Sequence, residues 1–298
     1  MIYQPRRPAR HETLTVRGLE HRFAWWGESK ESPIVLLHGF MDASETWQFV
    51  VDQMPDDWNF VAFDWRGFGE TARNSGLYWF PDYFADLEVI LDKLVPNERA
   101  RVVGHSMGGN VATMYAGIRP RRLQWLVSLE GLGMRRSTPS QAPENYERWL
   151  DDLKNPPRQK PYASLEPLAR LLQARNPRLT ADRAEFIAQA WTRKTDEGFE
   201  LATDPKHRLL NPTKYRREEA EACWRRAEIP VLMVLGELSE HPKLLGADCT
   251  EEYFRSVFRH VEIATIPGVG HMMHHEDPEG VARVIEQFAR SHVEGLKG

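Results

Sequence analysis

The chain has 298 residues, of which 41% are hydrophobic and 28% charged, and its formal net charge is -4 at pH 7. This length suits one large domain with an insertion, and the small negative charge gives no reason to expect a nucleic-acid partner. No run approaches the roughly 20 apolar residues of a membrane span, and two cysteines are too few for a disulfide framework, so we expect a cytoplasmic protein.

Short apolar runs alternate with helical patterns along most of the chain. This alternation predicts an α/β fold with a mostly parallel eight-stranded sheet flanked by helices. The predicted strands are 14–16, 21–26, 34–37, 60–63, 101–103, 123–129, 231–235 and 261–266. The predicted helices outside the middle third are about 47–53, 83–94, 107–117, 251–258 and 278–290. Too few residues join the first strands for a crossover helix, so we expect them to be antiparallel.

Two of the early strands end in glycine-containing turns. The strand at 34–37 leads into His38-Gly39-Phe40, and the strand at 60–63 leads into Asp64-Trp65-Arg66-Gly67-Phe68-Gly69. We expect His38 to brace its loop, and Asp64 and Arg66 to form an ion pair that holds the second turn.

The segment 101–109, RVVGHSMGG, places Ser106 where a β-branched run gives way to a helix-forming sequence. This is the pattern of a nucleophile elbow. Gly104 and Gly108 fit a turn so sharp that side chains there would collide with the neighbouring strand and helix. Ser106 also lies where a helix begins, so unpaired backbone N–H groups would face negative charge that develops on a substrate. We expect His105 to be a structural hydrogen-bonding residue.

The interval from 134 to 226 interrupts the alternation, because it contains no convincing strand but several helical segments separated by prolines. Its candidate helices are 143–153, 165–174, 181–191 and 215–224. We interpret 134–226 as a helical cap inserted into a core domain made of 1–133 and 227–298. Such a cap would lie over the C-terminal edge of the sheet, where ligands bind in open α/β folds.

A base is needed if Ser106 is to act as a nucleophile, because a serine hydroxyl attacks poorly unless its proton is removed. His271 follows the last predicted strand within Gly268-Val269-Gly270-His271, where the glycines allow a loop to bring an imidazole over the sheet edge. We prefer it to His274 and His275, which begin a helical stretch. No HExxH, paired-cysteine, GxGxxG or Walker pattern is present, so we expect a reaction without a metal or another cofactor.

Taken in order, the HG turn, the DxRGxG turn, GHSMGG and the late GH resemble the α/β-hydrolase superfamily, in the branch of small lidded serine hydrolases. The resemblance covers almost the whole chain apart from the middle third. It implies a Ser-His-acid triad that contains Ser106 and His271. It also implies an oxyanion hole formed by the backbone N–H groups of Met107 and Phe40.

Three carboxylates compete for the acid position of this triad. Many members of the superfamily carry an Asp in a Gly-x-x-Asp turn after the seventh strand, but the turn here is Gly236-Glu237-Leu238-Ser239. A second position lies just after the sixth strand, as in one haloalkane dehalogenase subgroup and in the serine-hydrolase-like group, and Glu130 occupies it here. Glu130 is therefore our prediction, Glu240 is the alternative, and Glu237 ranks below both.

The resemblance favours a serine hydrolase that cleaves carboxylic esters of small to medium hydrophobic substrates through an acyl-enzyme. Carbon-carbon bond hydrolases, lactonases, amidases and perhydrolases use the same residues and remain alternatives. Dehalogenases and epoxide hydrolases are disfavoured because they need an Asp where this chain has Ser106. A non-catalytic receptor for a small hydrophobic ligand is the alternative from another class.

Overall fold

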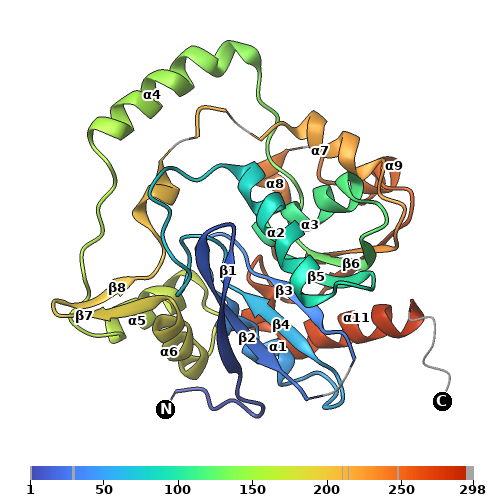
Figure 1. Cartoon of the computed structure of the whole chain (residues 1–298), viewed down its shortest axis with the longest axis horizontal. Coiled ribbons are helices and arrows are strands. Elements are labelled where there is room, and N and C mark those ends of the chain that lie inside the picture. Colours follow the sequence, from blue (N-terminus) through green and yellow to red (C-terminus); the bar gives the residue numbers. More distant parts are fainter. Residues whose placement is uncertain (1, 29–30, 210, 214, 247, 293–298) are drawn as a thin grey trace.

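An eight-stranded sheet forms the centre of the computed structural model, which describes residues 2–28, 31–209, 211–213, 215–246 and 248–292. Its strands, in spatial order, are β1 (Arg10–Val16), β2 (Leu19–Trp26), β4 (Phe60–Phe63), β3 (Ile34–Leu37), β5 (Ala100–His105), β6 (Leu123–Leu129), β9 (Val231–Gly236) and β10 (Val261–Ile266). Only β2 pairs antiparallel, with β1 and with β4, and the other neighbours are parallel. The predicted α/β fold with a mostly parallel sheet is confirmed (Figure 1).

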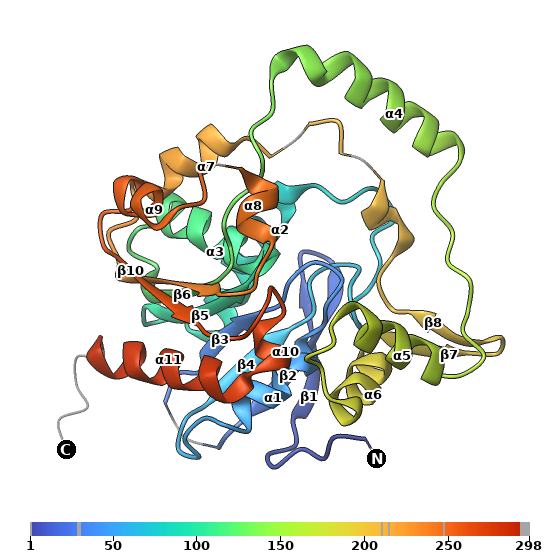
Figure 2. The same cartoon turned by 180° about the vertical axis from the view of Figure 1, so that it is seen from behind.

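Helices cover both faces of this sheet (Figures 1 and 2). They are α1 (Gln48–Val51), α2 (Phe80–Leu94), α3 (Met107–Ile118), α7 (Arg217–Trp224), α8 (His241–Leu245), α9 (Glu251–Val257), α10 (Met273–Glu276) and α11 (Pro278–Ser291). In β3, Val35 packs in the same apolar cluster as α2, α3 and α7, whereas Leu36 packs with α1 and α11. Alternate residues of the strand therefore pack into two separate cores, one on each face of the sheet, as a sheet between two layers of helices requires.

The parallel register sets the carboxyl ends of the central strands side by side. Leu37 at the end of β3 pairs with Gly104 of β5, and His105 at the end of β5 pairs with Leu129 of β6. The turns that follow these strands therefore meet at one edge of the sheet. Each glycine-containing motif of the sequence lies at that edge.

The chain between β6 and β9 contains α4 (Ala142–Lys154), α5 (Glu166–Arg175), α6 (Ala181–Ala190), β7 (Thr192–Thr195) and β8 (Gly198–Leu201) before it reaches α7. Our expectation that 134–226 contains no strand is wrong, because β7 and β8 form an antiparallel hairpin. Four-residue strands are too short to show a clear alternation in sequence.

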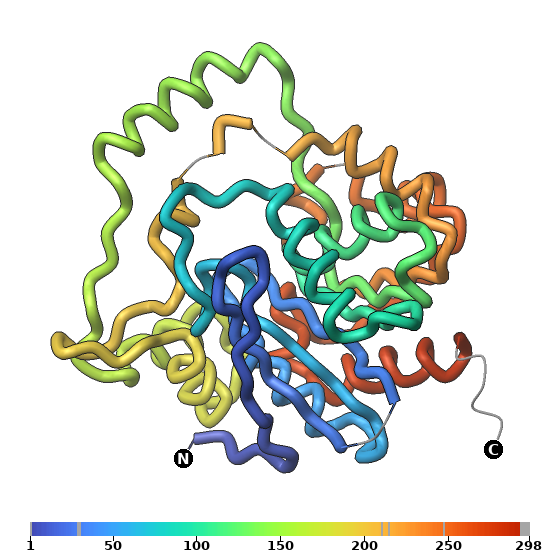
Figure 3. The backbone as a smooth tube through the Cα atoms, in the orientation of Figure 1, coloured from blue at the N-terminus to red at the C-terminus, as the bar shows by residue number. Residues whose placement is uncertain are grey.

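The helices of this inserted stretch differ in how they contact the rest of the molecule. Leu168 of α5 and Ile187 of α6 are buried in a cluster with Phe49 of α1. By contrast, α4 has no buried residue, and it stands away from the other elements in every view (Figures 1, 2 and 3).

Among the described residues, no helix has the length and apolar character needed to cross a bilayer.

Candidate active site

Ser106 occupies a strained turn between β5 and α3. Its backbone angles are φ 50° and ψ -111°, which a residue with a side chain adopts only when its surroundings enforce it. The Ser106 N–H donates to the carbonyl of Leu129 at 2.8 Å, which ties the turn to β6. A β-carbon on Gly108 would lie 2.4 Å from the carbonyl oxygen of Leu37, so the turn requires glycine there. The turn therefore holds Ser106 in a strained conformation at the edge of the sheet.

His271 lies beside Ser106 on the loop that follows β10. Its Nε2 is 3.0 Å from Ser106 Oγ, a hydrogen-bond distance for a proton transfer between them. The neighbouring His105 holds this loop, since its Nε2 lies 2.9 Å from the backbone oxygen of His271. His105 therefore makes a structural hydrogen bond.

Glu130 completes a chain of hydrogen bonds from the end of β6. Its Oε2 lies 2.7 Å from His271 Nδ1, and it also accepts from Ser239 Oγ at 2.7 Å. Its Oε1 accepts from the backbone N–H of Gly236 at 3.0 Å. Burial alone would raise the pKa of Glu130, but the hydrogen bonds from His271, Gly236 and Ser239 outweigh it and lower that pKa. Glu130 is therefore an ionised acceptor at neutral pH.

The other two candidate acids lie apart from His271. The Glu240 side chain is 68% exposed and pairs with Lys243 at 2.9 Å. The carboxylate of Glu237 accepts from the backbone N–H of Gly268 at 2.8 Å. Of the three carboxylates, Glu130 is the one that contacts the imidazole.

The two backbone donors predicted for an oxyanion hole flank Ser106. Met107 is the first residue of α3, and Phe40 follows Gly39 in the turn after β3. A β-carbon on Gly39 would lie 3.2 Å from Ser106 Cβ, so this turn passes directly beside the serine. Within the described part of the chain, neither N–H donates to another protein group. Both donors are free for an oxygen bound next to Ser106.

His241 also contacts His271, and the sequence reasoning missed it. The two imidazole rings stack with centroids 3.6 Å apart and planes 5° apart. Burial lowers the pKa of His241, as does the nearby charge of His271 when protonated. The sequence offered one signal for this contact: His241 comes two residues after Ser239, and Ser239 occupies the position at which many members of the superfamily carry the acid.

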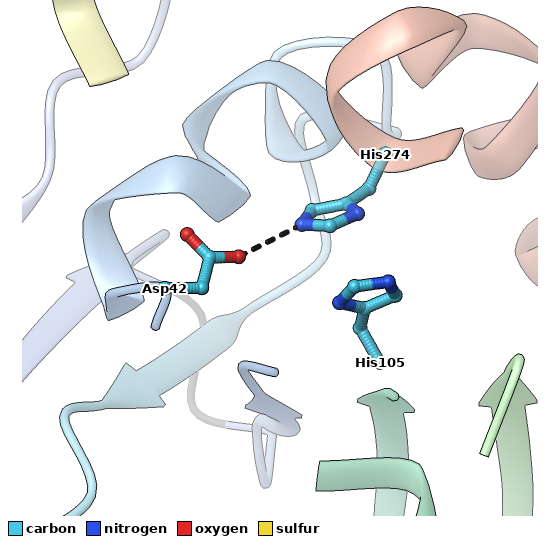
Figure 4. Close-up of side chains that lie close together, drawn as sticks. All are labelled: Asp42, His105 and His274. Atoms are coloured by element: carbon cyan, nitrogen blue, oxygen red, sulfur yellow. Dashed lines mark hydrogen bonds and ion pairs between the residues drawn. The ribbon is translucent and has the colours of Figure 1, made fainter. Parts of the chain in front are cut away.

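A second buried network is centred on Asp42, which the sequence reasoning also missed, and it lies close to His105, the residue before Ser106 (Figure 4). Asp42 Oδ2 lies 3.0 Å from His274 Nε2, and Asp42 Oδ1 accepts from Trp191 Nε1 at 2.9 Å. His274 lies on α10, three residues after His271, whereas Trp191 belongs to the inserted stretch. Asp42 therefore connects the loop after β3, the base of the His271 loop and the insertion.

In the part of the chain that the structure describes, two groups of side chains could each offer three ligand atoms to a metal ion, with those atoms within 4.8 Å of one another. They are Asp42, His105 and His274 (Figure 4), and Glu130, His241 and His271. In each group, one imidazole already lies within hydrogen-bond distance of the carboxylate. Each group is therefore already joined in part by a hydrogen bond between its own members.

The DxRGxG turn is held differently from our expectation. Asp64 does not pair with Arg66 but accepts backbone N–H groups of Ser44 at 2.7 Å and Glu70 at 2.8 Å. Arg66 instead binds Asp86 on α2, with Nε 2.6 Å from Oδ2. The pairing joins distant segments, which local sequence does not show. His38 does brace its loop, because its Nε2 accepts from the Trp65 N–H at 3.0 Å.

The environment of His207 makes the free energy of unfolding depend on pH. Its ring is stacked between Phe68 and Tyr78, with centroids 3.9 and 3.7 Å away, and burial lowers its pKa to about 4. The unfolded chain takes up this proton near pH 6.5, so the free energy of unfolding falls as the pH drops from 6.5 to 4. His207 should account for a loss of about 2 kcal/mol between pH 7 and pH 5.

Urea unfolding of the wild type and of His207→Phe at both pH values measures this contribution. The phenylalanine keeps a flat ring in the stack but cannot bind a proton, so its stability should fall less between pH 7 and pH 5. An equal fall in the two proteins would contradict the assignment.

Comparison with known proteins shows what this chain as a whole is similar to. The family model described as "Alpha/beta hydrolase family" matches residues 34–284. A serine hydrolase-like protein of Danio rerio is 27% identical over 292 residues, which cover 95% of this chain and 89% of the relative. A putative 2-succinyl-6-hydroxy-2,4-cyclohexadiene-1-carboxylate synthase of Bacillus subtilis is 24% identical, over 92% of this chain and 96% of the relative.

The solved structures agree on the fold. The thioesterase domain from the curacin biosynthetic pathway superposes with a TM-score of 0.81 at 20% identity, over 93% of this chain and 99% of that domain. At this identity the likeness concerns the backbone arrangement alone.

Proposed function

Since this chain belongs to the alpha/beta hydrolase family, we propose that it is a serine hydrolase that cleaves carboxylic esters of small to medium hydrophobic substrates. The observation that carries the proposal is the continuous hydrogen-bonded chain from Ser106 Oγ through His271 to Glu130. A serine, an imidazole and an ionised carboxylate in this order are the parts that acyl transfer needs. The serine hydrolase-like relative in Danio rerio has a name consistent with this chemistry.

The proposed reaction proceeds in two halves. Ser106 Oγ attacks the ester carbonyl while His271 Nε2 takes the hydroxyl proton, and Glu130 stabilises the imidazolium through Nδ1. The N–H groups of Phe40 and Met107 donate to the carbonyl oxygen as it becomes negative. The tetrahedral intermediate then expels the alkoxide, which receives the proton from His271. A water molecule then gives a proton to His271 and attacks the acyl carbon. The bond to Ser106 Oγ breaks, the carboxylic acid leaves, and His271 returns the proton to Ser106.

Exposed apolar side chains support a hydrophobic substrate. Phe40, Met134 and Leu238 follow β3, β6 and β9, whose ends form the edge at which Ser106 lies, and each is about half exposed. On α4, the exposed Tyr146, Leu150 and Leu153 add a second apolar surface. Apolar surface that remains exposed beside polar catalytic groups is typical of ligand sites.

We also propose that residues 134–226 act as a cap over a core made of 1–133 and 227–298. The stretch leaves the core at the end of β6, next to Glu130. Its Trp191 binds Asp42, and its helices α5 and α6 pack on Phe49, so part of it is anchored beside the site. The unburied α4 is the part that could contact a bound acyl group.

Initial rates on p-nitrophenyl esters from acetate to octanoate test this proposal. Burial contributes about 0.8 kcal/mol per CH₂ group, so kcat/KM for butyrate should exceed that for acetate by up to about 15-fold. Multiple turnovers with such a preference would support an esterase. Absence of turnover on every ester, together with ligand-dependent thermal stabilisation, would replace the proposal with the receptor alternative.

A further inference from the structure

The turn after β9 serves the triad in an unusual way. Ser239 stands where many family members carry the acid, and its hydroxyl donates to Glu130 at 2.7 Å. The same turn continues into α8, whose first residue is His241. The ring of His241 lies flat against His271. A turn without the acid therefore contacts both the carboxylate and the imidazole.

The stacked ring restrains a motion that the hydrogen bonds leave open. The bonds from His271 to Glu130 and to Ser106 both lie along the plane of the imidazole, at its two nitrogens. They resist sliding of the ring within this plane but resist tilting about the line between the nitrogens only weakly. A parallel ring 3.6 Å away opposes that tilt through contact over its whole face.

The charges around this stack favour an uncharged partner for His271. Among the described residues, the titratable side chains that interact with His271 are Glu130, His105, His241 and His274, and Ser106 Oγ lies at its Nε2. The other charged side chains near the start of α8 are Lys243, on the helix, and Glu240, the residue just before it. Both are exposed and they pair with each other. Burial lowers the pKa of His241, so its ring is neutral when His271 takes a proton. The face of a neutral aromatic ring attracts a cation.

We propose that His241 is a positioning residue: its ring fixes the plane of His271 and shields one face of the imidazolium during acyl transfer. This inference rests on the proposed function, because it assigns His271 the part of the base. His241 acts through its contact with the ring of His271, and we assign it no bond-making or proton-transfer step.

The experiment compares wild type with His241→Ala, His241→Phe, His241→Lys and the control Lys243→Ala, which alters the same helix away from His271. We expect His241→Ala to lower kcat about 10-fold with KM changed less than about 2-fold, because a misplaced base slows the chemical step. His241→Phe should restore most of this rate, since it supplies a flat ring. Lys243→Ala should keep the wild-type kcat.

Two further readouts separate positioning from a merely structural effect. The fixed charge in His241→Lys should shift the acidic limb of the kcat/KM profile to lower pH, because a nearby cation disfavours the imidazolium. A fluorophosphonate should label Ser106 more slowly in His241→Ala than in wild type, by about the same factor as kcat falls. This labelling reaction contains no ester, so it reports on the nucleophile independently of the substrate. Thermal melting of each variant verifies that it is folded.

The possible results distinguish a failure of the role proposed for His241 from a failure of the proposed function. Equal kcat and equal labelling rates in wild type and His241→Ala would overturn the role of His241 and leave the proposed function intact. A His241→Phe variant as slow as His241→Ala would also overturn it, because the ring would then not be the active feature. A wild type that neither labels nor hydrolyses esters would overturn the proposed function and this inference together.

Discussion

Replacing Ser106 by alanine should lower kcat for ester hydrolysis by about 10⁴-fold or more, since no acyl-enzyme can form without the hydroxyl. The backbone donors of Phe40 and Met107 would remain, so a slow background rate from bound substrate and water could persist. Initial rates on p-nitrophenyl butyrate, with wild type and variant at one pH, give the ratio directly.

The variant should fold, because alanine places the same β-carbon in the strained turn. Ser106 makes no side-chain cap for α3, and the loss is one hydrogen bond to His271, about 1 kcal/mol. Thermal melting verifies this. A folded Ser106→Ala protein that keeps more than about 1% of the wild-type rate would contradict the proposed mechanism.

Replacing Glu130 by glutamine should lower kcat by about 10³- to 10⁴-fold with little change in KM. The amide has the same shape but no charge, so it cannot stabilise the imidazolium, and it can reverse the tautomer of His271. Ser239 and Gly236 would still have an acceptor oxygen at this position for one of their hydrogen bonds. Steady-state kinetics on the same ester measures the effect.

Glu240→Gln is the matched control, because it makes the same chemical change on an exposed side chain that pairs with Lys243. Its kcat should stay within about 2-fold of wild type, since exposed ion pairs contribute little. If Glu240→Gln lost most of kcat while Glu130→Gln kept it, the acid would be assigned to the wrong carboxylate.

Much of the core could be predicted because its signals are local. The runs that form β3, β4, β6 and β10 match the predicted strands at both ends, since an apolar run bounded by turn residues is characteristic of a buried strand. The start of α2 was predicted three residues late, at 83 rather than at Phe80, because Pro81 at its first turn was not weighed as a start signal.

The residues of the candidate site also differ in how far local sequence could predict them. Ser106 and His271 sit in short motifs with a physical meaning, and the structure joins them by a hydrogen bond. Glu130 could be selected only through the family's second acid position. The geometry that brings it 2.7 Å from His271 depends on the pairing of β6 with β9.

The features that were missed depend on side chains from distant segments. Asp42 meets His274 across 232 positions of sequence, and α9 and β10 lie between His241 and His271 in the chain. Arg66 selects Asp86 rather than Asp64 because α2 packs beside the turn. Sequence patterns of period two or four do not contain such pairings, which arise only when the strands assemble.

Trapping the acyl-enzyme tests nucleophilic catalysis by Ser106 most directly. The protein would be mixed with excess p-nitrophenyl butyrate, quenched in acid within milliseconds to seconds, and analysed as intact protein and as peptides by mass spectrometry. We predict a butyryl adduct on the peptide that contains Ser106, and no such adduct in Ser106→Ala. An adduct on another residue, or turnover that Ser106→Ala retains at the wild-type rate, would contradict nucleophilic catalysis by Ser106.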